Sequence, residues 1–400
     1  MSHEASAGFR ARPRPQRARS FYDKEVQGII WQVVILGIVF GTGYWLFANM
    51  QHNLHVRQIQ TGFDFLGREA GYELGESLIA YSPASTYARA MLVGFLNTLH
   101  VAVIGVVLAT LLGVFVGIGT LSRNWLVAKL TAGYIHFLRN IPVLLQIILW
   151  YSILISDRIF PGPRQAEPVL GTYFTQRGIY FPVPEPHFAW TLAAVGLIVG
   201  LVLAWIVARW AKARQEATGE QFPTLLALPA IVLGVPALFW LIGGAPTAMS
   251  WPGLRGFNLT GGQRITPEFT AVLFGLTIYT SAFIGEIVRS GILSVAKGQI
   301  EAARAIGLRE SHILRLVTLP QALRVIIPPM TSQFLNLTKN SSLAVAVGYP
   351  DLVSAANTTL NQTGQSPEVI LIIMIVYLTT SLTTSLFMNW YNKRIALVER

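Results

Sequence analysis

The sequence predicts an all-α integral membrane protein with about eight transmembrane helices and both termini in the cytoplasm. Apolar residues make up 52% of the 400-residue chain and charged residues only 12%, about half the charged share of a typical globular domain. The mean hydropathy is +0.51. Long uncharged runs recur, and Lys and Arg gather in alternate connecting segments. The solvent for much of this chain is therefore lipid.

Eight apolar runs are long enough to be candidate spans. Five contain no Asp, Glu, Lys or Arg: 26–50, 101–122 with an extension back toward Met91, 188–208, 225–242 and 369–392. Three others are also predicted as spans on length: 130–156, which contains Arg139 and Pro142; 269–285, which is followed by Glu286; and 325–347, which contains two prolines and Lys339.

The positions of the basic residues orient these spans. With the N-terminus inside and eight crossings, the inner segments hold 20 Lys and Arg in 99 residues, and the outer segments hold 8 in 119. Cytoplasmic segments of membrane proteins carry such an excess. The net charge of +11 is therefore assigned to topology and to the lipid surface, and no nucleic-acid partner is predicted.

Residues 1–25 are predicted to be a disordered, basic cytoplasmic tail, because five arginines and two prolines fall within 10–19 and such a segment cannot bury a core. We expect the positive charge of the tail to fix the orientation of the first span. The alternative role for the tail is attraction to anionic lipid headgroups. The outer loops are rich in Pro, Gly and aromatic residues and are expected to cap the bundle, with contact to an extracellular partner as the other possibility.

Several classes of chemistry have no candidate residues. The chain has no cysteine, which excludes disulfides and thiolate metal sites. No Lys is followed by Ser or Thr, so a Walker A loop for ATP is absent. Hydrolase and metalloprotease motifs are also missing. We therefore predict a chain with no catalytic residue, no metal site and no bound cofactor of its own.

The cytoplasmic segment 289–324 is the most informative. A short alanine-rich helix is predicted over 294–306, ending at Gly307, because glycine is the usual residue just past a helix end. A second helix is predicted over 310–319, ending at Pro320, with Ile313, Leu316 and Val317 on one face. The thin surface left by the alanines would fit a groove on another protein.

This segment resembles the EAA loop of ABC-importer permease subunits, whose pattern is E-A-A-x3-G-x9-I-x-L-P. The sequence departs from it at one position, where Val317 replaces Ile. In that family the loop is the coupling helix that docks on the ATP-binding subunit. The matching residues are Glu301, Ala302, Ala303, Gly307, Leu319 and Pro320.

Other segments are similar to the polar amino acid branch of that family. They are Phe95 to Leu99, Phe137 to Gln146 (with Asn140-Ile141 in place of Gly-Thr), Tyr279 to Gly291, and Lys339 to Leu343. The typical subunit of this branch has five spans. With the extra span 26–50 and an insertion at about 157–268 in a permease domain of 91–390, the chain resembles the larger permease of general L-amino acid (Aap/Bzt) transporters.

The resemblance implies a subunit of a type I ABC importer in the bacterial inner membrane. Its partners would be two ATPase subunits carrying ATP and magnesium, a second and non-identical permease, and a periplasmic binding protein that delivers polar L-amino acids. The alternative is an ion-coupled secondary carrier, which would also place charges inside spans but would not need the EAA loop.

Charges inside spans are the candidate substrate path, since a charge at the bilayer centre costs roughly 2.5–3.5 kcal/mol and therefore faces a cavity or a partner. The candidates are Lys339, with its neighbours Asn340 and Ser341, together with Glu286 and Arg139. Cationic groups would suit a substrate carboxylate and Glu286 an ammonium. The structural alternatives are pairing of Glu286 with Arg289 one turn away and extension of Arg139 to the inner headgroups.

Overall fold

The computed structural model describes residues 24–56, 58 and 61–395, so the predicted basic tail lies almost entirely outside them. Seven of its helices are long and apolar enough to cross a membrane, or eight if one bent pair is counted as a single span. The predicted number of crossings is therefore confirmed with one change of shape. The long helices are α1 (Lys24–Val56), α2 (Tyr87–Gly119), α5 (Phe188–Thr218), α6 (Thr224–Ile242), α7 (Pro267–Leu293), α10 (Leu319–Asn340) and α12 (Ser366–Ile395).

The predicted span over 130–156 is broken in its middle and is not one continuous helix. It consists of α3 (Trp125–Arg139) and α4 (Val143–Leu154), which meet at 104°. Pro142 causes the break, because proline disfavours a helical conformation in the residue before it. The Gln146 side chain satisfies carbonyls freed at the bend, donating to Leu138 O and Ile141 O at 3.1 Å each.

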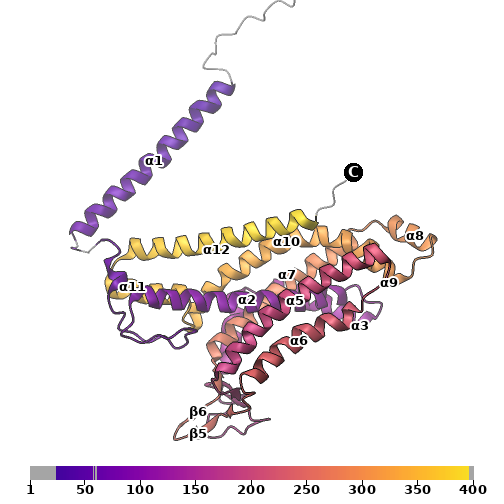
Figure 1. Ribbon diagram of the computed structural model, residues 1–400. Coiled ribbons are helices and arrows are strands. Elements are labelled where there is room, and N and C mark those ends of the chain that lie inside the picture. Colours follow the sequence, from indigo (N-terminus) through magenta and orange to yellow (C-terminus); the bar gives the residue numbers. More distant parts are fainter. Residues whose placement is uncertain (1–23, 57, 59–60, 396–400) are drawn as a thin grey trace, which may run out of the picture.

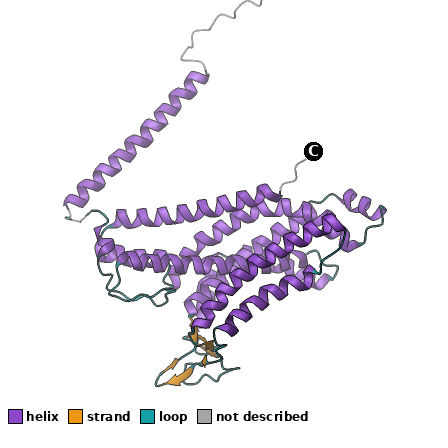
Figure 2. Ribbon diagram, viewed as in Figure 1, coloured by secondary structure: helices purple, strands orange, loops and turns teal. Residues whose placement is uncertain are grey.

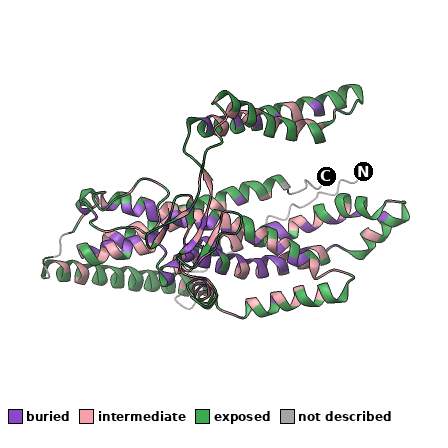
Figure 3. Ribbon diagram, turned by 90° about the horizontal axis from the view of Figure 1, so that it is seen from below, coloured by how far each residue is buried: buried purple, intermediate pink, exposed green. Residues whose placement is uncertain are grey.

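The core of the bundle is the contact between α2 and α7, and Figure 3 shows the buried residues gathered in the central helices. Glycines on α2 allow this close approach. A Cβ at Gly117 would lie 2.6 Å from Gly285 O, and one at Gly113 would lie 2.6 Å from Ile284 Cβ. Small residues at helix contacts are the usual means of bringing backbones together in lipid.

A second cluster covers the end of the bundle away from residues 297–305 (Figure 1). It joins the 3-10 turn η1 (Asp64–Gly67), the start of α2, α11 (Leu352–Thr363) and the start of α12, around Phe65 and Leu352, which are at most 1% exposed. The segment after α1 is tied to α12 here, since Gly62 N–H donates to Glu368 Oε1 at 2.8 Å. Helix α1 itself stands apart from the bundle and has no buried residue in its described length (Figure 1).

The insertion forms a hairpin of two helices, α5 and α6, that pack on each other. Its loops contain short strands, which the sequence did not predict: they gather at one end of the hairpin (Figure 2). Antiparallel pairing of β1, β2 and β7 makes one sheet, and the pairs β3–β4 and β5–β6 make two more. The strands are β1 (Tyr173–Thr175), β2 (Gly178–Phe181), β3 (Val183–Pro184), β4 (Met249–Ser250), β5 (Gly253–Arg255), β6 (Asn258–Thr260) and β7 (Gln263–Ile265).

The predicted cytoplasmic segment lies at the end of the bundle opposite α11 (Figure 1). It contains α8 (Lys297–Ala305), α9 (Glu310–Ile313) and the π-helical turn η2 (Leu314–Thr318), which runs on into α10. The second predicted helix therefore does not end at Pro320. Proline is tolerated there because it occupies the first turn of α10, after η2 has changed the hydrogen-bond register.

Candidate functional site

The alanine-rich helix α8 ends at Gly307 in a Schellman motif. Gly307 has φ +81°, Leu308 N–H donates to Ala303 O at 3.2 Å, and Gly307 N–H donates to Arg304 O at 2.9 Å. The helix end predicted at this glycine is confirmed. A Cβ at Gly307 would meet no atom within 4 Å, so the requirement for glycine is conformational rather than steric.

One face of α8 is free. Glu301, Ala302 and Ala305 are exposed, and the adjoining Ile306 is 77% exposed. Ala303 points the other way and is 5% exposed, so two of the three small residues can meet a partner. An isoleucine this exposed beside a small-residue helix surface is the kind of anchor that helix-in-groove recognition uses.

Polar contacts hold α8 to the rest of the loop and to the bundle. The Gln321 side chain on α10 donates to Gln299 Oε1 on α8. Arg304 pairs with Glu310 across the Gly307 turn, with Nε donating to Oε1 at 2.7 Å. The contact between Gln321 and Gln299 joins α8 to α10.

The face predicted for the second short helix is only partly correct. Ile313 is 2% exposed and Val317 is half-buried, but Leu316 is 60% exposed. The π-helical turn explains the difference, since it rotates later side chains relative to an α-helical wheel. Leu319 and Pro320 are also exposed, so both are accessible beside α8.

Two of the predicted substrate-path residues share one cavity. A space of about 350 Å³ is lined by Arg139, Phe283, Glu286, Ser290 and residues of α10 such as Gln333. The Arg139 guanidinium lies 5.1 Å from the Phe283 ring centroid. Glu286 accepts from Arg289 Nη1 at 2.9 Å, so the structural pairing considered for Glu286 is present. Arg139 is the basic residue that lines this cavity beside Glu286.

Lys339 is not part of that cavity. It lines a separate space of about 450 Å³ beside α12, with Leu371, Met374 and Leu378 among the walls. It lies six residues beyond Gln333, roughly 9 Å along the helix axis. Asn340 is half-buried, and Ser341 is 1% exposed and donates to Thr338 O at 2.6 Å. The predicted path therefore consists of two sites along α10.

A larger cavity of about 650 Å³ was missed by the sequence reasoning. It lies between the middle of α2 and the segment that leads into α7, and Glu76, His100 and Arg264 contribute polar groups to its walls. Glu76 accepts from Thr266 Oγ1 at 2.9 Å, and burial raises the pKa of its carboxyl group. No sequence signal could find it, because its walls come from four segments that are distant in the chain.

Residues 109–397 match the family described as Binding-protein-dependent transport system inner membrane component. The chain is 48% identical over 382 residues to the General L-amino acid transport system permease protein AapQ of Rhizobium johnstonii, an alignment that covers 95% of each chain.

Two further relatives are similar over nearly their whole lengths. The Putative amino-acid ABC transporter permease protein YhdX of Escherichia coli is 47% identical, with 95% of this chain and 97% of the relative covered. The Glutamate/glutamine/aspartate/asparagine transport system permease protein BztB of Rhodobacter capsulatus is 41% identical, with 100% and 99% covered. The chain therefore belongs to the family of binding-protein-dependent transport system inner membrane components.

Proposed function

We propose that this chain is the permease subunit of an ATP-driven importer of polar L-amino acids. In this proposal it pairs with a second, non-identical permease, docks on two ATPase subunits that bind ATP and magnesium, and receives its substrate from a periplasmic binding protein. The chain itself binds no cofactor. ATP binding draws the ATPase subunits together, and α8 passes that motion to α10.

The observation that carries this proposal is the free face of α8. The helix is short, ends in a defined turn at Gly307, exposes small residues beside Ile306, and is hydrogen-bonded to α10. A rigid helix with a thin surface, fastened to a spanning helix, suits the transmission of movement from a soluble partner. A secondary carrier would have no use for such an element.

The substrate class is supported by the charges inside the spans and by the relatives' names. Arg139 and Glu286 place both signs on one cavity, as a zwitterion with an α-carboxylate and an ammonium would require. Relatives are named for general L-amino acids and for glutamate, glutamine, aspartate and asparagine. We assign to this chain a substrate of that polar class.

The test replaces Gly307 by valine, with Gly307→Asn as the matched control. Valine at φ +81° is strained by about 1–2 kcal/mol, whereas asparagine tolerates this region. If the strain distorts docking, the affinity for the ATPase falls about 5- to 30-fold. The measurements are ATPase copurified per permease and ATP-dependent uptake of labelled glutamate into proteoliposomes.

We expect Gly307→Val to reach normal membrane abundance, because Gly307 lies outside the spans. It should lose ATPase and uptake together, while Gly307→Asn keeps both. Normal ATPase retention and uptake in Gly307→Val would remove the coupling role from α8. Uptake by wild-type protein without ATP, driven by an ion gradient, would instead establish the carrier alternative.

A further inference from the structure

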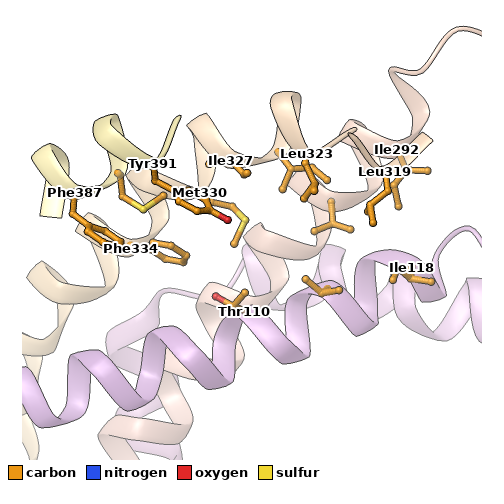
Figure 4. Close-up of a pocket in the computed structure, with 14 residues that line it drawn as sticks. Thr110, Ile118, Ile292, Leu319, Leu323, Ile327, Met330, Phe334, Phe387 and Tyr391 are labelled. Carbon is orange, nitrogen blue, oxygen red and sulfur yellow. The ribbon is translucent and has the colours of Figure 1, made fainter. Parts of the chain in front are cut away.

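Two cavities of the described chain differ in the chemistry of their walls. The first is a groove of about 460 Å³ between α2, α7, α10 and α12. The residues labelled in Figure 4 are apolar apart from Thr110 and Tyr391, and no charged side chain from the described residues lines the groove. The second is the cavity of about 650 Å³ lined by Glu76, His100 and Arg264. Its size and its mixture of apolar and charged groups are typical of small-molecule sites, which span about 300–1,000 Å³.

The second cavity lies at the end of α7 where that helix begins. Its walls come from 75–78, from α2, from strand β2 and from 262–266, which leads into α7. Ser77 and Arg264 are exposed, whereas Thr266 is buried, so the cavity opens to solvent on one side and is closed by the start of α7 on the other. Because the far end of α7 leads into α8, this opening is on the side of the membrane predicted to be external.

The Glu76 carboxylate is fixed by the first turn of α7. Thr266 Oγ1 donates to Glu76 Oε2 at 2.9 Å, and Thr266 also caps α7, accepting from Phe269 N–H at 3.1 Å. Asn97 Nδ2 on α2 donates to the backbone oxygen of Glu76 at 2.9 Å. The other carboxylate oxygen, Oε1, accepts no hydrogen bond in the described structure. The carboxylate is therefore oriented through one oxygen and can accept from a ligand through the other.

Arg264 is held in the same cavity by strand pairing. It lies opposite Tyr180 in the β2–β7 pair, and directly opposed residues on antiparallel strands place their side chains on one face. The guanidinium is 6.0 Å from the centroid of the Tyr180 ring, and Tyr180 is only 4% exposed. Arg264 forms no ion pair within the part of the chain that the structure describes. An unpaired guanidinium can bind a carboxylate through two parallel hydrogen bonds.

The other titratable groups nearby leave these two charges available. His100 is the one further titratable residue among the described residues of the wall. Glu268 adds a second negative charge near Glu76, but it lies outside the wall and its Oε1 accepts from Tyr151 OH at 3.2 Å. Asp351 is 0% exposed and also lies outside the wall. The excess of acid beside Glu76 favours a cationic group of a ligand at that end of the cavity.

We propose, on the basis of the function proposed above, that this cavity binds the transported amino acid at its entry from the external side, with the α-carboxylate on Arg264 and the ammonium group on Glu76. Opposite charges that are held by separate partners, and not by each other, suit a zwitterion that bridges them. The site is distinct from the cavity lined by Arg139 and Glu286, because Glu286 is 17 residues beyond Phe269 on α7, roughly 26 Å along the helix axis.

The test uses the absence of cysteine from the chain. Ser77→Cys places one thiol in the exposed part of the wall, and Ser82→Cys, exposed in the same loop but outside the wall, is the matched control. The full assembly in nanodiscs, without binding protein or ATP, is treated with a maleimide, and alkylation of this chain is followed by mass spectrometry. We expect L-glutamine to slow alkylation at position 77 and not at position 82.

Two analogues of glutamine test each charge of the ligand. Glutaramate lacks the ammonium group, and 4-aminobutanamide lacks the α-carboxylate. Each should protect position 77 at least about ten-fold more weakly than L-glutamine, because a hydrogen bond to a charged group is lost.

Variants of the two charged residues, made in the Ser77→Cys chain, assign each end of the ligand. Glu76→Gln should weaken protection by L-glutamine at least about ten-fold and make L-glutamine and glutaramate equal. Arg264→Gln should weaken it as much and make L-glutamine and 4-aminobutanamide equal. The controls are Glu73→Gln and Arg255→Gln, which change exposed residues outside the wall and should leave protection unchanged.

Several results would overturn the proposal. Equal protection at positions 77 and 82 would show that the effect is not local. Equal protection by the three compounds in the Ser77→Cys chain would show that neither charge is recognised, and this comparison needs no change to Glu76 or Arg264. Protection by the purified binding protein, and not by free amino acid, would make the cavity a protein interface.

Uptake measured on the same assembly separates this site from the transport function. No protection by L-glutamine in an assembly that takes up labelled glutamine with ATP would overturn the site and leave the proposed function intact. Protection by L-glutamine, with both analogues weaker and no ATP-driven uptake, would support the site and remove the importer function.

Discussion

Asp351 is the residue whose surroundings are most unusual for its chemistry. It caps α11 and accepts from Ser354 N–H at 2.8 Å, yet it is 0% exposed and its second carboxylate oxygen has no partner in the described structure. The side-chain amide of Asn97 does not donate to this oxygen; its Nδ2 donates to Pro350 O and Glu76 O. Burial raises the pKa of Asp351 from 3.8 to about 7.

This carboxyl group should make the protein less stable as the pH rises. The unfolded chain releases the proton near pH 3.8 and the folded chain near pH 7, so stability falls across that window by up to about 4 kcal/mol and then levels off. Asp351→Asn keeps a good cap and cannot ionise. We expect wild-type protein in detergent to unfold at a lower temperature at pH 8.0 than at pH 5.5, and Asp351→Asn to shift much less.

The same shift in both proteins would assign the pH dependence to other groups. Glu76 is the first to examine, since burial raises its pKa as well.

Lys339 carries the weaker part of the proposed substrate path. It is exposed to its cavity and forms no ion pair in the described chain. Hydrogen bonds to charged groups contribute about 1.5–3 kcal/mol, so Lys339→Met should lower uptake at low substrate at least about ten-fold. Lys339→Arg keeps the charge and should retain much of the activity. Normal uptake by Lys339→Met, measured beside equal ATPase retention, would leave this lysine a structural role.

Among the elements, the hairpin α5–α6 packs largely on itself. Neither hydrophobic cluster of the bundle contains a residue from it. Its two ends are held together, because Val183 pairs with Ser250 and Glu185 N–H donates to Ala248 O at 3.0 Å. Those ends lie as close as the two strands of a β-hairpin.

This closeness predicts that the hairpin can be removed. Replacing residues 186–247 by Asn-Gly should join β3 to β4 through a tight two-residue turn and remove an even number of spans. We expect normal membrane abundance and an unfolding temperature within a few degrees of wild type. The control deletes the same residues without the turn, which strains the junction. Loss of insertion in the Asn-Gly variant would show that the hairpin supports the bundle.

The strands of this insertion show why elements of two to four residues escape prediction. The lengths of β1 to β7 are too short for an alternating pattern to emerge. Their pairing joins β2 to β7, which are separated by the whole hairpin. By contrast, the broken span α3–α4 could have been anticipated from Pro142, since its effect on the preceding residue is local.

At the scale of the whole molecule, the distribution of basic residues predicts sidedness. A reporter placed within 211–218, the C-terminal end of α5, should be cytoplasmic, and one within 161–168 should be external. The reason is the excess of Lys and Arg in the inner segments. The measurement is accessibility of a single introduced cysteine to a membrane-impermeant thiol reagent. Labelling at 211–218 from outside would show that α5 and α6 do not both cross.

The number and order of the spans could be read from the chain because each depends on a continuous run of about 20 apolar residues. The EAA loop was equally accessible, since Glu301, Gly307 and Pro320 lie within 20 residues and Gly307 ends its helix through local geometry. The remaining features depend on contacts between segments that are distant in the chain. These contacts form the cavity lined by Arg139 and Glu286, bury Asp351, and place Lys339 on a different cavity. These depend on how helices pack in three dimensions, and a one-dimensional pattern of hydrophobicity and charge does not encode that packing.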